Sequence, residues 1–348
     1  MKIVIAAGGT AGHVVPAIAV ADALRAEGAE VVFVGSERAE AELVPAAGYP
    51  LEPIRAEGIS RSNPLKAARA MGKAVAGLAT ARRILARHRP DAVLGGGGYV
   101  AGPVGLAAVG CRVPLVLTEA DSHLGVTNRL LAPRARRVCL AFAIDGRDGP
   151  RYVVTGRPVP TADTDRAGAR AHFGIADDEL CVLIFGGSLG ARSINEASLE
   201  AFADAPFRVL HVAGRRDFGA LESPSGGHYD LRDYVMPFGR ALAAADLSVA
   251  RSGGSVFELA QYGLPAVLVP YPHASADHQT SNAHWMERAG AAVVIADAEL
   301  TAQRLARTVG ELAGDPVRLA AMAAASRRLA RPDAARDIAR EVLEVAGR

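Results

Sequence analysis

The chain alternates short apolar runs with longer amphipathic stretches, and this alternation dominates its first half. Runs of four to seven mostly apolar residues are typical of strands buried on both faces of a sheet. The runs are "KIVIAA" (2–7), "VVFVG" (31–35), "AVLGG" (92–96), "VPLVLTE" (113–119), "RRVCLAF" (136–142) and "RYVVTG" (151–156). Because helical periodicity fills the stretches between them, the pattern predicts βα units around a parallel sheet.

The pattern breaks between residues 156 and 165, where Pro, Thr and Asp replace the apolar runs. It then restarts, and the later runs are "CVLIF" (181–185), "RVLHVAG" (208–214), "DLSVARSGG" (246–254), "PAVLVPYP" (265–272) and "AAVVIA" (291–296). A chain of 348 residues can bury two cores. We therefore predict an α/β protein with two Rossmann-like, doubly wound domains, residues 1–157 and 158–331, that face a cleft. The helical segment 332–348 either closes the second domain or packs back on the first.

Three glycine-rich turns follow predicted strands, at Gly8–Gly12, Gly95–Gly98 and Gly186–Gly190. Glycine lets backbone N–H groups approach a phosphate, and a following helix N-terminus adds partial positive charge. None of the turns has the Gly-Lys-Ser/Thr ending of a Walker loop, and the first also lacks the spacing of a dinucleotide fingerprint. A tight turn without a ligand is the alternative for each of them. In the third turn, the hydroxyl of Ser188 could donate to a phosphate oxygen.

Three further groups of polar residues are candidates for chemistry. His13 ends the first glycine turn, just before a helix expected from Pro16, and it is either a base or part of the loop. Glu258 lies one helical turn beyond Gly253–Ser255, where a carboxylate can accept both hydroxyls of a ribose or can complement the helix dipole. Gln279 and Asn282 share a helix face by their spacing, which suits sugar hydroxyls, capping or solvent.

Composition and charge narrow the classes of function. No apolar stretch approaches the roughly 20 residues of a membrane-spanning helix. The start of the sequence shows no pattern of a secretory leader. The cysteines, three in number, suit buried thiols. We expect a cytosolic protein with no metal site. Residues 1–157 carry 20 Lys and Arg against 13 Asp and Glu, a net +7, and the remainder carries −5. The excess favours anionic partners such as phosphates or acidic lipids, although it also fits an ordinary solvated surface.

The segment 61–89 holds eight Lys or Arg and no acid. Apolar residues recur in it at helical spacing, at Met71, Val75, Leu78 and Leu85. The segment therefore predicts a basic amphipathic helix that lies on an anionic membrane surface. An ordinary helix packed on the first sheet with a basic solvent face is the alternative.

Five motifs, taken together, resemble the MurG family of N-acetylglucosaminyltransferases. They are "GGTAGHVVPAIAVADAL", "LGGGGYVAGP", "FGGSLGARSIN", "RSGGSVFELAQYGLP" and "DHQTSNA", in this order over essentially the whole chain. The resemblance implies the GT-B fold and inverting, metal-independent transfer of GlcNAc from UDP-GlcNAc to undecaprenyl-diphospho-muramoyl-pentapeptide. It also implies a peripheral enzyme on the cytoplasmic side of the cell membrane, with no cofactor and no nucleic-acid partner. Backbone amides and a helix N-terminus could stabilise the departing UDP without a metal.

The resemblance also implies roles for individual residues. The expected donor-binding residues are Thr10, Ala11, Gly12, Ser188, Val235, Gly254, Ser255, Val256, Phe257, Glu258, Gln279 and Asn282. Among them, the Ser188 loop would hold the diphosphate and Glu258 the ribose, while Gln279 and Asn282 would read the GlcNAc hydroxyls. Gly9, Tyr99 and Asp121 would face the acceptor. An inverting displacement needs a base, for which His13 is the first candidate and Glu119 the second.

The chain departs from the family pattern at several of these positions. The family's "HEQN" appears as Thr118, Glu119, Ala120 and Asp121, and the Arg of "GNPVR" is replaced by Pro160, with Arg157 as a candidate substitute. Leu189 replaces the Gln of "GGSQGA", and Ala11 replaces a Gly. These departures leave room for a glycosyltransferase with another lipid or small-molecule acceptor. A UDP-sugar 2-epimerase and a non-catalytic binding protein are further alternatives.

Overall fold

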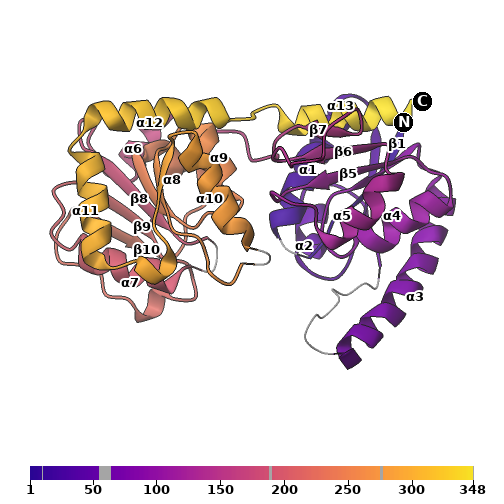
Figure 1. Ribbon diagram of the computed structural model, residues 1–348, viewed down its shortest axis with the longest axis horizontal. Coiled ribbons are helices and arrows are strands. Elements are labelled where there is room, and N and C mark those ends of the chain that lie inside the picture. Colours follow the sequence, from indigo (N-terminus) through magenta and orange to yellow (C-terminus); the bar gives the residue numbers. More distant parts are fainter. Residues whose placement is uncertain (10, 55–63, 188–189, 275–276, 348) are drawn as a thin grey trace. The chain divides into compact units, whose positions relative to one another are not determined.

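The computed structural model describes residues 1–9, 11–54, 64–187, 190–274 and 277–347, with the backbone alone at residues 11 and 64–75. The chain divides into two compact units (Figure 1). The first unit contains Met1–Val159 together with Arg331–Arg348, and the second contains Pro160–Ala330. Each unit is a parallel sheet with helices packed against it, so the predicted α/β fold of two doubly wound domains is confirmed.

The first unit is built on a parallel sheet whose described strands follow the order β3-β2-β1-β4-β5-β6-β7. Its strands are β1 (Lys2–Ala6), β2 (Glu30–Gly35), β3 (Leu51–Pro53), β4 (Ala92–Gly95), β5 (Leu115–Glu119), β6 (Arg137–Leu140) and β7 (Tyr152–Val154). Its helices are α1 (Ala11–Ala26), α2 (Ala39–Ala46), α3 (Pro64–His88), α4 (Ala101–Gly110), α5 (Val126–Leu131) and α13 (Ala334–Ala346), with a 3-10 turn at Ala132–Arg134. The C-terminal helix α13, at the top of the first unit in Figure 1, contacts α1, β4, β5 and β6.

Strand β1 shows why this sheet needs helices on both faces. Ile3 and Ile5 pack into a core with α1 and α13, whereas Val4 and Ala6 point into a second core with α3 and α4. Side chains of successive strand residues alternate between the faces, and all of these are fully buried. A continuous apolar run without polar alternation is therefore the expected signature of such a strand.

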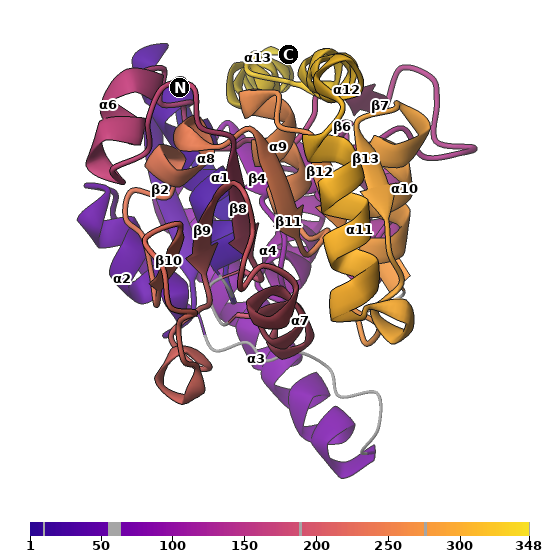
Figure 2. The same cartoon turned by 90° about the vertical axis from the view of Figure 1, so that its left-hand side faces the viewer.

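The second unit repeats this plan with the described strand order β10-β9-β8-β11-β12-β13. Its strands are β8 (Cys181–Phe185), β9 (Arg208–Val212), β10 (Tyr229–Arg232), β11 (Leu247–Ala250), β12 (Ala266–Leu268) and β13 (Ala292–Val294). Its helices are α6 (Arg166–His172), α7 (Arg192–Ala201), α8 (Gly239–Ala244), α9 (Ser255–Tyr262), α10 (His278–Arg288), α11 (Ala302–Ala313) and α12 (Pro316–Leu329), with 3-10 turns at Phe218–Ala220 and Asp297–Glu299. Helix α10 packs beside the edge strand β13, as Figure 2 shows.

Helix α3 corrects part of the prediction for the basic segment. Leu78 and Leu85, expected on a lipid-facing stripe, instead pack into the core of the first unit, where α3 contacts α4. The cations Arg82, Arg83 and Arg87 are exposed. The end of α3 is thus a helix packed on the domain with a basic solvent face, because its apolar stripe has a partner inside the protein. Residues 61–63 and the side chains of Met71 and Val75 lie outside the described part. Among the described residues, no helix is both long and apolar enough to cross a membrane.

Candidate active site

The order of strands in the first sheet brings two glycine-rich turns together. Strands β1 and β4 are neighbours although β2 and β3 lie between them in sequence, so the connections diverge at this point. Ligands of open α/β sheets bind beyond the carboxyl ends of strands at such a place. Here it holds a cavity of about 270 Å³ that His13, Gly97, Glu119, Asp121 and Arg157 help to line.

His13 lies in the first turn of α1, which begins at Ala11 rather than near Pro16 as expected. Its ring lies against the second glycine turn. Gly97 has a φ of +98°, and a Cβ at this position would stand 2.8 Å from Nδ1 of His13. Burial lowers the pKa of His13, the Arg157 cation lowers it further, and the Asp121 carboxylate opposes both. The imidazole is therefore neutral at pH 7 and free to accept a proton.

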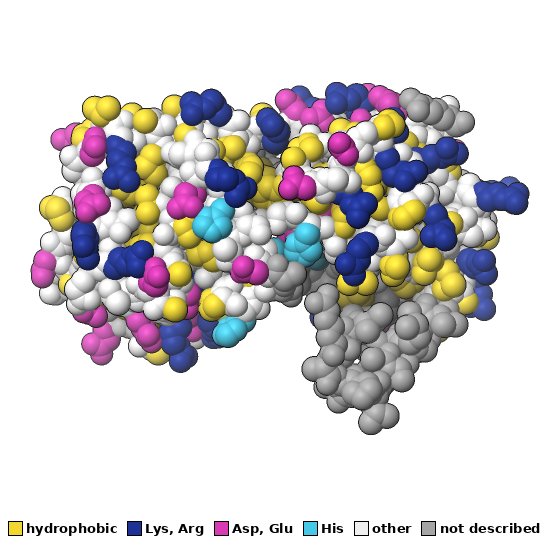
Figure 3. Space-filling model, viewed as in Figure 1, with side chains coloured by type: hydrophobic (Ala, Val, Ile, Leu, Met, Phe, Trp, Pro, Cys, Tyr) yellow, Lys and Arg dark blue, Asp and Glu magenta, His cyan; other side chains and the backbone are white. Residues whose placement is uncertain are grey.

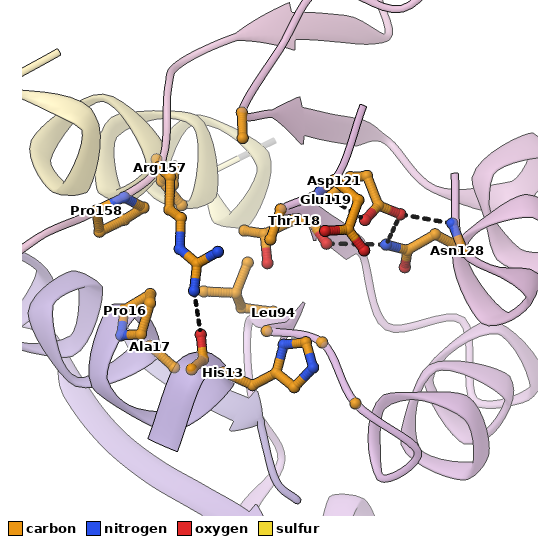
Figure 4. Close-up of a pocket in the computed structure, with 18 of the residues that line it drawn as sticks. His13, Pro16, Ala17, Leu94, Thr118, Glu119, Asp121, Asn128, Arg157 and Pro158 are labelled. Carbon is orange, nitrogen blue, oxygen red and sulfur yellow. Dashed lines mark hydrogen bonds between the residues drawn. The ribbon is translucent and has the colours of Figure 1, made fainter. Parts of the chain in front are cut away.

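Arg157 holds the start of α1 through a hydrogen bond to the backbone. Its Nη2 donates to the carbonyl oxygen of Gly12 at 2.7 Å. This carbonyl lies four residues before Pro16, which has no N–H to complete the helical hydrogen bond. The guanidinium supplies the missing donor, which explains how α1 can begin so far ahead of its proline. Figure 4 shows this bond beside His13 at the cavity.

Glu119 ends β5 as expected, but its carboxylate is engaged with the protein. Oε2 accepts hydrogen bonds from Gly125 N at 2.8 Å and Asn128 Nδ2 at 2.9 Å, and Oε1 accepts one from Asp121 N at 3.2 Å. The Glu119 residue is 7 % exposed. Burial raises the pKa of its carboxyl group, and this outweighs the hydrogen bonds, which lower it. Figure 4 shows the carboxylate tied to Asn128. Glu119 thus holds the loop 119–125, and its role as the second candidate base stays a prediction.

The remaining acceptor-side predictions concern the first glycine turn and its surroundings. Gly9 donates its N–H to the buried carboxylate of Glu40 at 3.0 Å, so this amide is not available to a phosphate. Tyr99 follows the second glycine turn, and its hydroxyl bonds to Ser36 Oγ at 2.7 Å. Thr10 lies outside the described residues, and nothing is described of the Ala11 side chain.

The second sheet has its own divergence point, between β8 and β11. The turn after β8 requires glycine: Gly187 and Gly190 have φ values of +94° and +82°, and a Cβ at Gly190 would collide with the carbonyl of Ala213. Ser188 and Leu189 lie between them, outside the described residues. The turn after β11 leads into α9, whose N-terminus is at Ser255. Two glycine-rich turns thus begin where the neighbouring strands β8 and β11 end.

The side chains expected to line the uridine are mostly buried inside the second unit. Val256 is 0 % exposed, Phe257 is 4 % exposed and Val235 is 7 % exposed. Phe257 packs on Trp285 with ring centroids 5.2 Å apart. A ligand at this helix end would therefore meet mainly the backbone of these residues, and their contact with uridine stays a prediction. Gly254 and Ser255 are half-buried and open the helix.

The polar side chains expected to bind the donor fall into two groups. Glu258 is half-buried in the first turn of α9, and Gln279 accepts a hydrogen bond from Tyr271 N at 3.0 Å through Oε1. Asn282, in contrast, is 2 % exposed and donates from Nδ2 to the carbonyl of Ser252 at 3.0 Å. The side chain of Asn282 turns inward and braces the loop after β11, and its contact with sugar hydroxyls stays a prediction.

Arg251 organises the second site, and the sequence analysis did not single it out. Its Nη1 donates to the carbonyls of Val269 and Pro270, both at 3.1 Å, and to Asp297 Oδ1 at 2.6 Å. Its Nη2 donates to Ser193 Oγ at 2.9 Å, at the start of α7. One guanidinium thus ties together three loops. The place of Arg251 in the sequence, between β11 and the glycines that follow it, was the signal that could have identified this residue. Across the described ranges, no cluster of three or more His, Cys, Asp or Glu side chains could hold a metal ion.

Comparisons with known proteins cover nearly the whole chain. The sequence model of the glycosyltransferase family 28 N-terminal domain matches residues 3–140, and that of the family's C-terminal domain matches residues 181–338. The UDP-N-acetylglucosamine–N-acetylmuramyl-(pentapeptide) pyrophosphoryl-undecaprenol N-acetylglucosamine transferase of Moorella thermoacetica is 42 % identical, over 99 % of each chain.

Two solved structures set the fold in context. The crystal structure of Acinetobacter baumannii MurG superposes with a TM-score of 0.82 at 31 % identity, over 99 % of each chain. The UDP-GlcNAc 2-epimerase of Neisseria meningitidis, bound to UDP-GlcNAc, gives 0.68 at 15 % identity, over 99 % of this chain and 100 % of that one. At this identity the second likeness concerns the fold alone.

Proposed function

The chain belongs to glycosyltransferase family 28, and from this premise we propose that it transfers GlcNAc from UDP-GlcNAc to undecaprenyl-diphospho-muramoyl-pentapeptide. The observation that carries the proposal is the 42 % identity, over 99 % of both chains, to a transferase named for this donor and acceptor. The matching structure at 31 % identity supports the same reading. The epimerase alternative has only a shared fold in its favour.

In this reaction we assign His13 as the general base. An acceptor hydroxyl oxygen forms a bond to the anomeric carbon of GlcNAc while the bond from that carbon to UDP breaks. UDP leaves with the electron pair, and the hydroxyl proton passes to the imidazole. Burial lowers the pKa of His13 and so keeps its imidazole neutral, and this state together with its place in the cavity supports the assignment. Glu119 and Arg157 act as positioning residues, the first for the loop 119–125 and the second for the start of α1.

We assign UDP-GlcNAc to the second unit, at the turns that follow β8 and β11. The glycine turn 186–190 and the N-terminus of α9 would offer backbone N–H groups to the diphosphate, which is the group such sites favour. Glu258, half-buried in the first turn of α9, would accept the ribose hydroxyls. Arg251 and Asn282 brace these turns from inside the unit.

We further propose that the first unit binds the anionic cytoplasmic surface of the membrane through a face of α4 and α5. Leu106, Val126 and Leu130 are 53 %, 47 % and 66 % exposed, and Arg129 lies exposed among them on α5. In Figure 3, yellow apolar side chains alternate with dark blue cations over this part of the first unit. Exposed apolar groups beside cations suit an acidic bilayer surface, and each near-surface cation contributes on the order of 1 kcal/mol.

The test is a transfer assay with purified protein. UDP-GlcNAc is offered with a short-chain muramoyl-peptide diphospholipid, and UDP release and lipid product are followed. We expect release that depends on the acceptor, and a loss of kcat of roughly 100-fold or more in His13→Gln, since a positioned base contributes about 10²–10⁴-fold. The exposed His172→Gln is the matched control and keeps wild-type rates.

Two outcomes would contradict the proposal. UDP release at the same rate without acceptor would exclude this transfer. Conversion of UDP-GlcNAc alone to its 2-epimer would place the protein with the epimerases. If release occurs with a different lipid or small hydroxyl compound but not with the muramoyl lipid, the fold and donor assignments stand and the acceptor assignment fails.

A further inference from the structure

A carboxylate without a role in the reaction lies beneath the first glycine turn. Glu40, on α2, is 0 % exposed. Its Oε2 accepts the N–H of Gly9 at 3.0 Å, and its Oε1 accepts the N–H of Ser36 at 2.7 Å and the Ser36 hydroxyl at 2.5 Å. Buried polar groups need such partners, because an unpaired one is costly. These bonds join the turns after β1 and β2 to one side chain.

Tyr99 completes this group, which we call the Glu40 cluster (Gly9, Ser36, Glu40 and Tyr99). Its hydroxyl lies 2.7 Å from Ser36 Oγ. Ser36 uses its only hydroxyl proton on Glu40, so the Tyr99 hydroxyl must donate to Ser36. The order of donation therefore runs from Tyr99 to Ser36 to Glu40. Tyr99 is half-buried, and its hydroxyl oxygen retains only acceptor capacity.

Close packing fixes the backbone of the turn against the same carboxylate. A Cβ at Gly8 would stand 2.5 Å from Oε1 of Glu40, and one at Gly9 would stand 3.1 Å from the ring of Tyr99. Burial opposes ionisation of Glu40, but the bonds from Ser36 and Gly9 outweigh it and hold its pKa below the ordinary value. The cluster therefore carries a negative charge directly under the glycine turn at neutral pH.

We propose that Glu40 is a positioning residue which turns the Gly9 N–H and the Tyr99 hydroxyl proton away from the substrate. The cluster adjoins the cavity, because Gly98, which lines the cavity, packs against Gly8 in the first glycine turn. At this border the cluster offers hydrogen-bond acceptors and a buried negative charge. It suits the hydroxyl or amide N–H groups of an acceptor sugar or peptide and disfavours a diphosphate. The inference rests on the proposed function for its substrate, but the hydrogen bonds that carry it belong to the protein alone.

Three variants separate positioning from mere stability. Glu40→Gln keeps the shape but replaces one oxygen by an NH₂ group, which must face the N–H of Gly9 or the two donors of Ser36. Tyr99→Phe breaks the bond between Tyr99 and Ser36, whereas Ser36→Ala breaks this bond and the bond from the Ser36 hydroxyl to Glu40. Both variants leave the Gly9 bond intact. Glu42→Gln is the matched control, because Glu42 is exposed on the same helix.

In the transfer assay we expect Glu40→Gln to raise the acceptor KM roughly tenfold or more, as for a buried donor left unpaired, with the UDP-GlcNAc KM unchanged. Ser36→Ala and Tyr99→Phe raise the acceptor KM less. The double variant is no worse than Ser36→Ala alone, because Tyr99→Phe removes only a bond that Ser36→Ala already removes. In hydrogen–deuterium exchange, the peptide containing Gly9 exchanges faster in Glu40→Gln than in Glu42→Gln.

Several results would overturn the proposal. One is a Glu40→Gln protein of lower melting temperature whose acceptor KM and kcat stay within twofold of wild type. Equal changes in the KM for the acceptor and the KM for UDP-GlcNAc would also overturn the proposal. If Glu40→Gln does not fold, unchanged acceptor KM values in Ser36→Ala and Tyr99→Phe overturn it. If the wild type transfers no sugar, the proposed function fails, and the exchange of the Gly9 peptide still decides whether Glu40 holds the turn.

Discussion

Replacing Gly97 by alanine tests the assignment of His13 as base without touching the imidazole. Gly97 has a φ of +98°, and a Cβ added there would stand 2.8 Å from His13 Nδ1. Ordinary contacts between such atoms are about 3.5–4.0 Å, so the ring must move by about 0.7–1.2 Å. A displacement of this size at a reacting group costs up to about 100-fold in rate. We therefore expect kcat to fall about 10- to 100-fold.

Backbone strain is a second effect of this substitution and needs its own control. A left-handed conformation costs an alanine roughly 1–2 kcal/mol relative to glycine. Gly28 has a φ of +80°, but a Cβ there would meet no atom within 4 Å. Gly28→Ala therefore carries comparable strain without a collision. Both variants should melt at similarly lowered temperatures, and only Gly97→Ala should lose kcat.

A double variant makes the reasoning refutable. In a His13→Ala background the collision partner is gone, so adding Gly97→Ala should lower kcat no further. The assay is steady-state UDP release with saturating donor and acceptor, alongside thermal unfolding. Wild-type kcat in Gly97→Ala would show that His13 does not act at its observed position. A further loss in the double variant would show that Gly97 itself contacts the substrate.

Three further predictions follow from the first unit. Arg157→Gln removes a cation that lowers the pKa of His13, so the acidic limb of the kcat–pH profile should move to higher pH. Asp121→Asn removes an anion that raises the pKa of His13, so the same limb should move to lower pH. Shifts of the same sign in both variants would contradict this electrostatic explanation. Glu119→Ala leaves buried donors unpaired and should cost about 2–5 kcal/mol in urea unfolding; a change under about 0.5 kcal/mol would contradict the bracing role. Leu130→Glu should weaken sedimentation with anionic vesicles and leave transfer to a soluble short-chain acceptor unchanged.

The fold could be predicted from sequence because its central strands are buried on both faces. Their continuous apolar runs gave the positions of β1, β4, β8 and β11 directly. The two strands that the sequence analysis missed, β3 and β10, lie at sheet edges. One is a three-residue "LEP" segment and the other reads "YDLR", so neither has the apolar signature. An edge strand pairs on one side only and can be short and polar.

The site was predicted less completely, because spacing places side chains on a face without saying which way that face turns. Gln279 and Asn282 do share α10, but Asn282 points into the unit and braces the Ser252 carbonyl. Glu119 ends its strand as expected, yet its oxygens are taken by groups up to nine residues away. Glu40 carried no signal, since its role comes from contacts with turns that only the folded sheet brings to it.

The departures from the family pattern make more physical sense in the structure than in the sequence. Asp121 and Arg157 both line the cavity beside His13, where one raises and the other lowers the pKa of the same imidazole. Each change alone would shift the base, whereas together they oppose each other. Arg157 also satisfies the carbonyl that Pro16 leaves without a donor. The two side chains therefore act on the pKa of His13 in opposite directions, and Arg157 also holds the backbone at the start of α1.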